Sequence, residues 1–116
     1  MRHLSKHPLA VFAAMLAFGA IGCGSTVGDY CEAWAECEGG NDRDREACVQ
    51  LEEGEGGAAS AYDCFDEWVA RMECLEKYST CDDSDPSNPD FDDNDACDSE
   101  RDKLNACIEA ASANDP

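Results

Sequence analysis

The sequence contains only two histidines, His3 and His7, and both lie close to the N-terminus. Basic side chains are also scarce, with 8 Lys and Arg against 27 Asp and Glu and a net charge of −19. Without an imidazole elsewhere in the chain, neither a catalytic triad nor a histidine base is available, so we expect no enzyme and no catalytic residue. The excess of negative charge disfavours nucleic acid and anionic headgroups as partners, and leaves basic proteins and cations.

Closely spaced cysteine pairs are missing as well. Zinc sites and thiol oxidoreductases use C-x2-C or similar pairs, whereas the closest cysteines here, Cys31 and Cys37, have five residues between them. The sequence therefore predicts structural disulfides, and neither a zinc site nor a redox cofactor.

Long apolar runs are limited to one. It spans Leu9–Ile21, follows the basic segment Met1–Pro8 and contains no polar side chain. This run is shorter than the ~20 residues that a helix needs to cross a bilayer. A basic segment followed by a short apolar run is typical of an export signal, so residues 1–22 are predicted to be a cleaved signal peptide.

The end of this segment, Ala20-Ile21-Gly22-Cys23, resembles the lipobox of bacterial lipoproteins. The resemblance implies that Cys23 becomes the first residue of the mature protein and carries a covalent lipid, with palmitate among its acyl chains. Because Gly24 follows, and not Asp, it also implies the outer membrane of a Gram-negative bacterium, on its periplasmic or cell-surface face. The alternative is ordinary secretion, since small residues at positions 20 and 22 also suit the general signal peptidase. Cleavage removes Arg2 and Lys6 but no acid, which takes the net charge from −19 to −21.

The cysteine count agrees with a lipid on Cys23. The chain has 9 cysteines, and setting Cys23 aside leaves an even eight, enough for four disulfides in an oxidising compartment. Residues 23–116 contain roughly fifteen large apolar side chains, a thin core for a domain of this size. We therefore expect disulfides to supply much of the stability.

Apolar residues recur at helical spacing throughout the exported part, and β-branched residues are few. The fold class predicted is all-α, a small disulfide-stapled bundle of about four helices with an acidic, Asp-rich loop before the last helix. The domain boundaries expected are the signal peptide over 1–22, a short tether over 23–28 and a cysteine-rich helical domain over 29–116.

The first two helices are marked by start and stop signals. The first is expected to begin at Asp29, which forms an Asp-x-x-Glu start signal with Glu32, and to end at Gly39-Gly40. The second is expected to begin at Asn41 or Asp42. It should end at a run of glycines: Gly54, Gly56 and Gly57.

The third helix is expected from about Ala58 to Ser79 and to form the core. Its apolar residues follow three-four spacing: Tyr62, Phe65, Trp68, Val69, Met72, Leu75 and Tyr78. The acidic segment 82–94 contains two prolines and many aspartates, which predicts a loop. A fourth helix, capped by Asn94 or Asp95, should follow, and residues 113–116 should fray.

Two cysteine pairs repeat one spacing on two of these helices. Cys64 and Cys74 have nine residues between them, and so do Cys97 and Cys107. A ten-residue step keeps both sulfurs near one face of a helix. In an antiparallel hairpin that turns at Asp85-Pro86, Cys64 lies opposite Cys107 and Cys74 opposite Cys97. That turn falls inside the predicted loop.

This pattern resembles the twin C-x9-C helical hairpin of the coiled-coil-helix-coiled-coil-helix family, over residues 64–107 only. In that family the outer two cysteines pair and the inner two pair, which implies the disulfides Cys64–Cys107 and Cys74–Cys97. The long acidic loop, Cys81 and the export signal depart from the family.

The remaining four cysteines are assigned from a second antiparallel hairpin. A hairpin that turns at Gly39-Gly40 places Cys31 opposite Cys48, which leaves Cys37 to pair with Cys81. Eight cysteines allow roughly a hundred pairings, so at this stage the assignment stays open.

The acidic loop was also compared with calcium-binding loops. Asp90, Asp92 and Asn94 fit the first, third and fifth positions of an EF-hand, but Asp95 replaces the required Gly and Arg101 replaces the closing Glu. These three residues are candidate ligands, and no specific metal site is assigned.

The expected function is that of a membrane-anchored, exported lipoprotein acting as a structural or protein-interaction module, with a basic protein as the possible partner. The alternative is a binding protein for calcium or a small cationic ligand through the acidic loop. Six aromatics could line a pocket, but their helical spacing favours core positions: Tyr30, Trp34, Tyr62, Phe65, Trp68 and Tyr78. The oligomeric state is left open.

Overall fold

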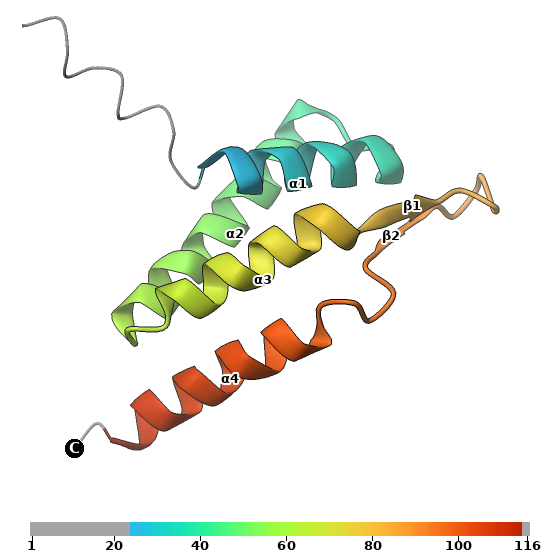
Figure 1. Cartoon of the computed structure of the whole chain (residues 1–116). Coiled ribbons are helices and arrows are strands. Elements are labelled where there is room, and N and C mark those ends of the chain that lie inside the picture. The colour runs from blue at the N-terminus through green and yellow to red at the C-terminus, as the bar shows by residue number, and fades with distance from the viewer. Residues whose placement is uncertain (1–23, 115–116) are drawn as a thin grey trace, which may run out of the picture.

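The computed structural model of the chain describes residues 24–114. The signal peptide and the lipid attachment site expected at Cys23 lie outside the described residues. The described part has four α-helices and a short β-hairpin, so the prediction of a small, mostly helical, disulfide-stapled domain is confirmed (Figure 1). The elements are α1 (Gly24–Glu38), α2 (Asp42–Ala61), α3 (Phe65–Tyr78), β1 (Thr80–Asp82), β2 (Asp90–Asp92) and α4 (Asp98–Ala113).

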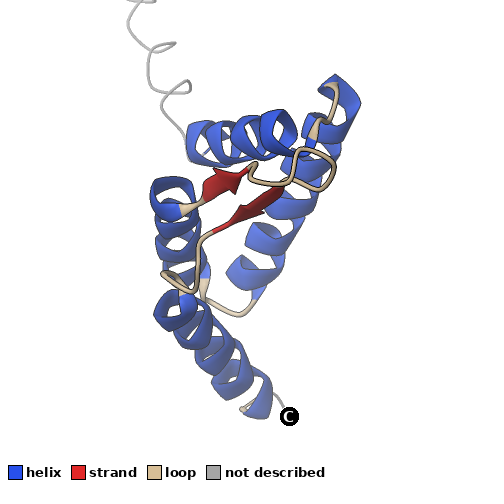
Figure 2. Ribbon diagram, turned by 90° about the vertical axis from the view of Figure 1, so that its right-hand side faces the viewer, coloured by secondary structure: helices blue, strands red, loops and turns tan. Residues whose placement is uncertain are grey.

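Helix α3 is the centre of the arrangement. Helices α1 and α2 pack against each other and both contact α3, while α4 lies along α3 on its other side (Figures 1 and 2). The β-hairpin extends from the end of α3 and contacts α1. Among the described residues, no helix is long and apolar enough to span a membrane.

The buried core is small and includes disulfide cysteines. Its members share exposures of 7% or less: Val27, Cys31, Ala59, Cys64, Trp68, Met72 and Leu104. Several residues of the predicted apolar stripe lie largely outside this core, since Tyr62, Phe65 and Tyr78 are 40%, 37% and 47% exposed. The disulfides therefore stabilise a domain whose apolar interior alone is slight.

Helix α1 begins at Gly24, so residues 24–28 are helical and the start expected at Asp29 is too late. Val27 lies one helical turn before Cys31, and both are almost fully buried, at 1% and 0% exposure. Burial of Val27 extends the packed face towards the N-terminus, and this packing overrides the start signal at Asp29.

Helix α2 begins as expected and ends later than expected. Asn41 is its N-cap and forms a capping box with Asp44. The helix then continues through all three glycines to Ala61, so the predicted stop is wrong. Gly56 is buried against the indole ring of Trp68, a close approach that a larger residue would block.

The start of the third helix is corrected by the same extension of α2. Helix α3 begins at Phe65 and not at Ala58. The chain turns at Asp63, whose φ of 58° is in the left-handed region that Asp tolerates better than most residues.

The acidic segment is not entirely a loop. Residues at both sides of it form an antiparallel hairpin with the pairs Thr80↔Asp92, Cys81↔Phe91 and Asp82↔Asp90, so the loop is confined to residues 83–89 and to the turn that follows Asp92. Helix α1 holds these strands in place: the ring of Phe91 contacts that of Tyr30 at 5.6 Å, and its backbone N–H donates to Glu38 Oε1. Composition alone does not reveal these contacts.

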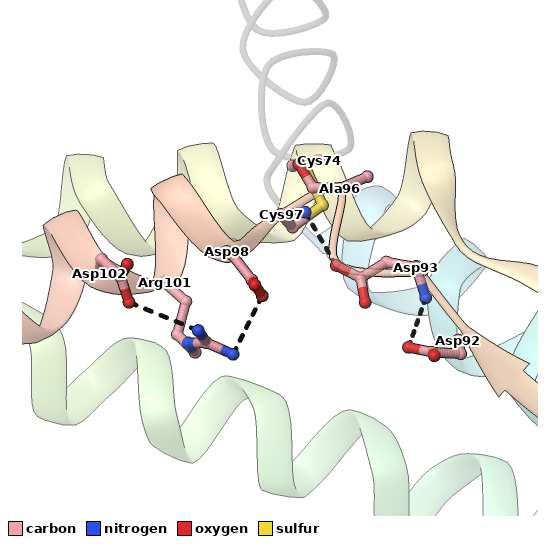
Figure 3. Close-up of polar contacts among 8 residues, drawn as sticks. All are labelled: Cys74, Asp92, Asp93, Ala96, Cys97, Asp98, Arg101 and Asp102. Carbon is pink, nitrogen blue, oxygen red and sulfur yellow. Dashed lines mark hydrogen bonds and ion pairs between the residues drawn. A yellow bond between two sulfur atoms is a disulfide. The ribbon is translucent and has the colours of Figure 1, made fainter.

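Helix α4 begins at Asp98, later than the expected cap at Asn94 or Asp95. Those two residues have φ of 51° and 64° and make a left-handed turn instead. The carboxylate of Asp93 accepts a hydrogen bond of 2.9 Å from the N–H of Cys97, the N-cap residue (Figure 3).

Candidate functional site

All eight cysteines of the described residues are in disulfides. The pairs are Cys31–Cys48, Cys37–Cys81, Cys64–Cys107 and Cys74–Cys97, with Cα–Cα distances between 5.5 and 6.0 Å. They coincide with the four pairs expected from the sequence. Disulfides form and persist in oxidising compartments, which indicates that the domain is exported.

Two of these disulfides join α3 to α4 at opposite ends. Cys64 is the N-cap of α3 and Cys97 the N-cap of α4, and each bonds to a cysteine within the other helix. Glu67 and Glu100 each lie near one of these pairs, within 4.8 Å of both sulfurs. Because the sulfurs are bonded to each other, they are not thiolate ligands, and these clusters are not metal sites.

The structure does not assemble a metal site from the calcium candidates. Asp90 and Asp92 lie in β2 on either side of Phe91, and Asp92 Oδ1 accepts a hydrogen bond of 2.8 Å from the N–H of Asp93. Within residues 24–114, neither belongs to a group of three acidic or cysteine side chains with ligating atoms within 4.8 Å. Asn94 lies in the left-handed turn that precedes α4.

Other carboxylates of the acidic loop form local turns. Asp82 Oδ1 accepts from the N–H of Ser84, and Asp85 Oδ1 accepts from the N–H and hydroxyl of Ser87. These hydrogen bonds lower the pKa of both Asp82 and Asp85. Both carboxylates thus stabilise the shape of the loop.

A cavity of about 350 Å³ lies between α1 and α2. Helix α1 contributes two aromatic side chains, and α2 contributes two acidic, two aliphatic and one disulfide-bonded side chain. These lining residues are Tyr30, Trp34, Asp44, Ala47, Cys48, Leu51 and Glu52. The cavity is open to solvent at one side, where Leu51 is 66% exposed.

Of the two acids that line this cavity, Glu52 has a carboxylate oxygen without a hydrogen-bond partner within the described residues. This oxygen, Oε2, is buried. Burial raises the pKa of Glu52, the nearby Glu55 raises it further, and Arg71 partly opposes both. The pKa of Tyr30 is also raised, first by burial and then by the charge of Glu52.

Two of the other cavities are less suited to a charged ligand. One of about 320 Å³ is apolar and lined by Val27, Gly56, Phe65 and Trp68. Another of about 340 Å³ contains Arg71 and Arg101. These arginines already pair with Glu55 and Asp98, at 3.4 and 3.1 Å.

The cavity between α1 and α2 was not predicted from the sequence, although the sequence contains a signal for it. Once Cys31 is paired with Cys48, the residues one turn to either side of Cys48 on α2 are Asp44 and Glu52. They face α1 at the level of its aromatics, and Cys48 and both acids line the cavity.

Comparisons of the chain with protein families, with curated proteins and with solved structures found no match.

Proposed function

We propose that the protein is a lipid-anchored interaction module that holds an acidic, disulfide-stapled domain against an exported membrane face, where it binds a basic protein. The observation that carries the proposal is the closed set of four disulfides among the eight cysteines that follow Cys23. These eight cysteines form all four disulfides among themselves, so none of them needs Cys23 as a partner. We therefore assign Cys23 as the site of acylation.

The start of α1 supports anchoring close to the membrane. The helix begins at Gly24, the residue that follows Cys23, and Val27 is already part of the core. A lipid on Cys23 would thus connect to the folded domain with almost no linker. We place the anchor in the outer membrane of a Gram-negative cell, on the basis of the residue after Cys23.

The charge of the exported part supports a basic partner. Only six Lys and Arg remain after residue 22, against 27 acids. Arg71 and Arg101 are each paired with a carboxylate, so they offer little positive charge to solvent. Such a domain attracts basic surfaces and repels anionic ones, and the attraction weakens as salt rises.

Membrane fractionation and affinity capture test the two parts of the proposal separately. Wild-type protein should fractionate with membranes, and Cys23→Ser protein should not. Capture from native membranes should recover a basic protein that elutes as salt concentration rises. Membrane association of the Cys23→Ser variant would contradict the anchor, and a salt-insensitive partner would contradict the electrostatic mode of binding.

A further inference from the structure

The α1–α2 cavity combines aromatic rings with carboxylates, whereas the rest of the acidic surface attracts cations by charge alone. We propose that this cavity binds an organic cation, an ammonium or guanidinium group, against the rings of Tyr30 and Trp34 and the carboxylates of Glu52 and Asp44. The inference goes beyond the proposed function, and it applies whether or not Cys23 is acylated.

The two aromatics supply the first part of a cation site. Tyr30 and Trp34 are four residues apart on α1, so they lie on one face of the helix, one turn apart. Aromatic faces attract ammonium and guanidinium groups, Trp most strongly, and the attraction grows as the cation is desolvated. Both rings are half-buried, so a cation that packs on them in this open hollow is partly desolvated.

The carboxylates supply the counter-charge. Glu52 has a buried oxygen without a hydrogen-bond partner within residues 24–114, and its half-buried carboxylate is only partly compensated by Arg71, so an approaching cation stabilises its charged form. Asp44 receives a hydrogen bond of 2.9 Å from the N–H of Asn41 through Oδ2. This bond holds the Asp44 side chain at the edge of the cavity.

The cavity is held in shape before any ligand binds. The Cys31–Cys48 disulfide joins its two walls, and the capping box fixes the start of α2. On the α1 side, the ring of Tyr30 packs on that of Phe91 in the hairpin. A rigid site loses little conformational freedom on binding.

The chemistry of the lining selects among ligands. No Lys, Arg or His lines the cavity, which disfavours an anion. Calcium requires six to eight oxygen ligands, and aromatic side chains occupy the positions where those would be needed. A volume of about 350 Å³ lies at the small end for ligand pockets, so the cavity suits one small molecule or one side chain.

A titration of the oxidised protein, purified from an exporting host, tests the proposal. The probes are the amides of N-acetyl-arginine and N-acetyl-lysine, with N-acetyl-norleucine amide as the neutral counterpart. The indole N–H signal of Trp34 should shift in a saturable way with the two cations and not with norleucine. The signal of Trp68, which lies outside this cavity, should stay unchanged and shows that the fold is intact.

Two neighbouring variants separate the cavity from the general acidity of the protein. Glu52→Gln should weaken binding of the cations by about tenfold, because it removes the buried counter-charge. Glu53→Gln changes the charge by the same amount one position along α2, outside this cavity, and should leave binding unchanged. Equal weakening by both variants, or equal binding of the norleucine amide, would overturn the proposal.

The same measurement distinguishes the source of the cation. Saturation by the free amides alone identifies a small-molecule site. Much tighter binding when the Arg or Lys is presented within a basic peptide identifies the side chain of a protein partner. A Trp34 signal that responds to neither form would show that the cavity does not bind cations. That result would not affect the proposed membrane anchor or the proposed salt-sensitive binding of a basic protein.

Discussion

The indole of Trp68 in α3 lies directly against Gly56 in α2. A Cβ atom placed on Gly56 would be 2.9 Å from carbon atoms of the ring, which is shorter than a van der Waals contact between carbon atoms, so the ring would have to move. The lack of a side chain at Gly56 therefore lets the buried indole of Trp68 pack directly on the backbone of α2.

Substitution at the glycines of α2 should have opposite effects at neighbouring positions. Gly56→Ala should lower the free energy of unfolding by about 1–3 kcal/mol, because the methyl group displaces the Trp68 ring. Gly57→Ala, with no atom near the added methyl, should raise it by about 0.5–1 kcal/mol through helix propensity. Urea unfolding measures both, and equal stabilisation by the two changes would contradict the packing.

The two disulfides between α3 and α4 should differ in their contribution. Cys64–Cys107 closes a separation of 43 residues and Cys74–Cys97 one of 23. The chain-entropy relation gives about 4 kcal/mol for the outer bridge and about 0.5 kcal/mol less for the inner one. Replacing each pair by alanines and unfolding in urea tests this, and a larger loss from the inner pair would argue against it.

Asp93 should stabilise the start of α4 in a pH-dependent way. Burial raises the pKa of Asp93, but its hydrogen bonds, first that from the Cys97 N–H, outweigh this and lower the pKa below 3.8. A lowered pKa means that the stabilisation is present above pH 3.8 and is lost as the pH falls through the folded-state value. Urea unfolding of the Asp93→Ala variant should show a cost of about 1 kcal/mol at neutral pH and little in acid. A cost that is equally large in acid would contradict the role of the carboxylate.

Glu52 should show the opposite pH dependence. Its pKa is raised above 4.5, so the protonated form stabilises the fold below pH 4.5, and this stability is lost as the pH rises through the folded-state value. At neutral pH, Glu52→Gln should therefore raise the free energy of unfolding by about 0.5 kcal/mol, a small gain because solvent screens this half-buried site. The difference should close in acid, and a variant less stable than wild type at neutral pH would contradict the assignment.

Cysteine positions carried most of the fold prediction. The repeated nine-residue spacing and the turn near Pro86 agree with a hairpin whose strand register is centred on that proline. Disulfide geometry requires nearby Cα atoms, so spacing on regular helices restricts which cysteines meet. The four-helix outline followed from the helical spacing of the apolar residues and from the start and stop signals.

The errors arose where tertiary packing overrides local signals. Glycines usually end helices, but those of α2 lie in its interior, and Gly56 is there because Trp68 packs on it. Likewise, Val27 is buried before the start signal at Asp29, and contacts with α1 order the strands of the acidic loop. None of these contacts is visible from neighbouring residues in the sequence.

The candidate cavity was missed for a related reason. Helical spacing alone assigns Tyr30 and Trp34 to the core, and it assigns Asp44 and Glu52 to a solvated face. The disulfide between Cys31 and Cys48 joins the two faces. Because the cysteine spacing leaves that pairing open, it does not reveal the cavity.

Intact-mass spectrometry of the protein extracted from membranes shows whether Cys23 is acylated. We expect a chain that begins at Cys23, carries lipid on that residue alone and retains four disulfides. The Cys23→Ser variant should yield no lipid-modified form. A wild-type chain that begins at residue 23 without lipid, or one in which Cys23 is bonded to another cysteine, would contradict the acylation of Cys23.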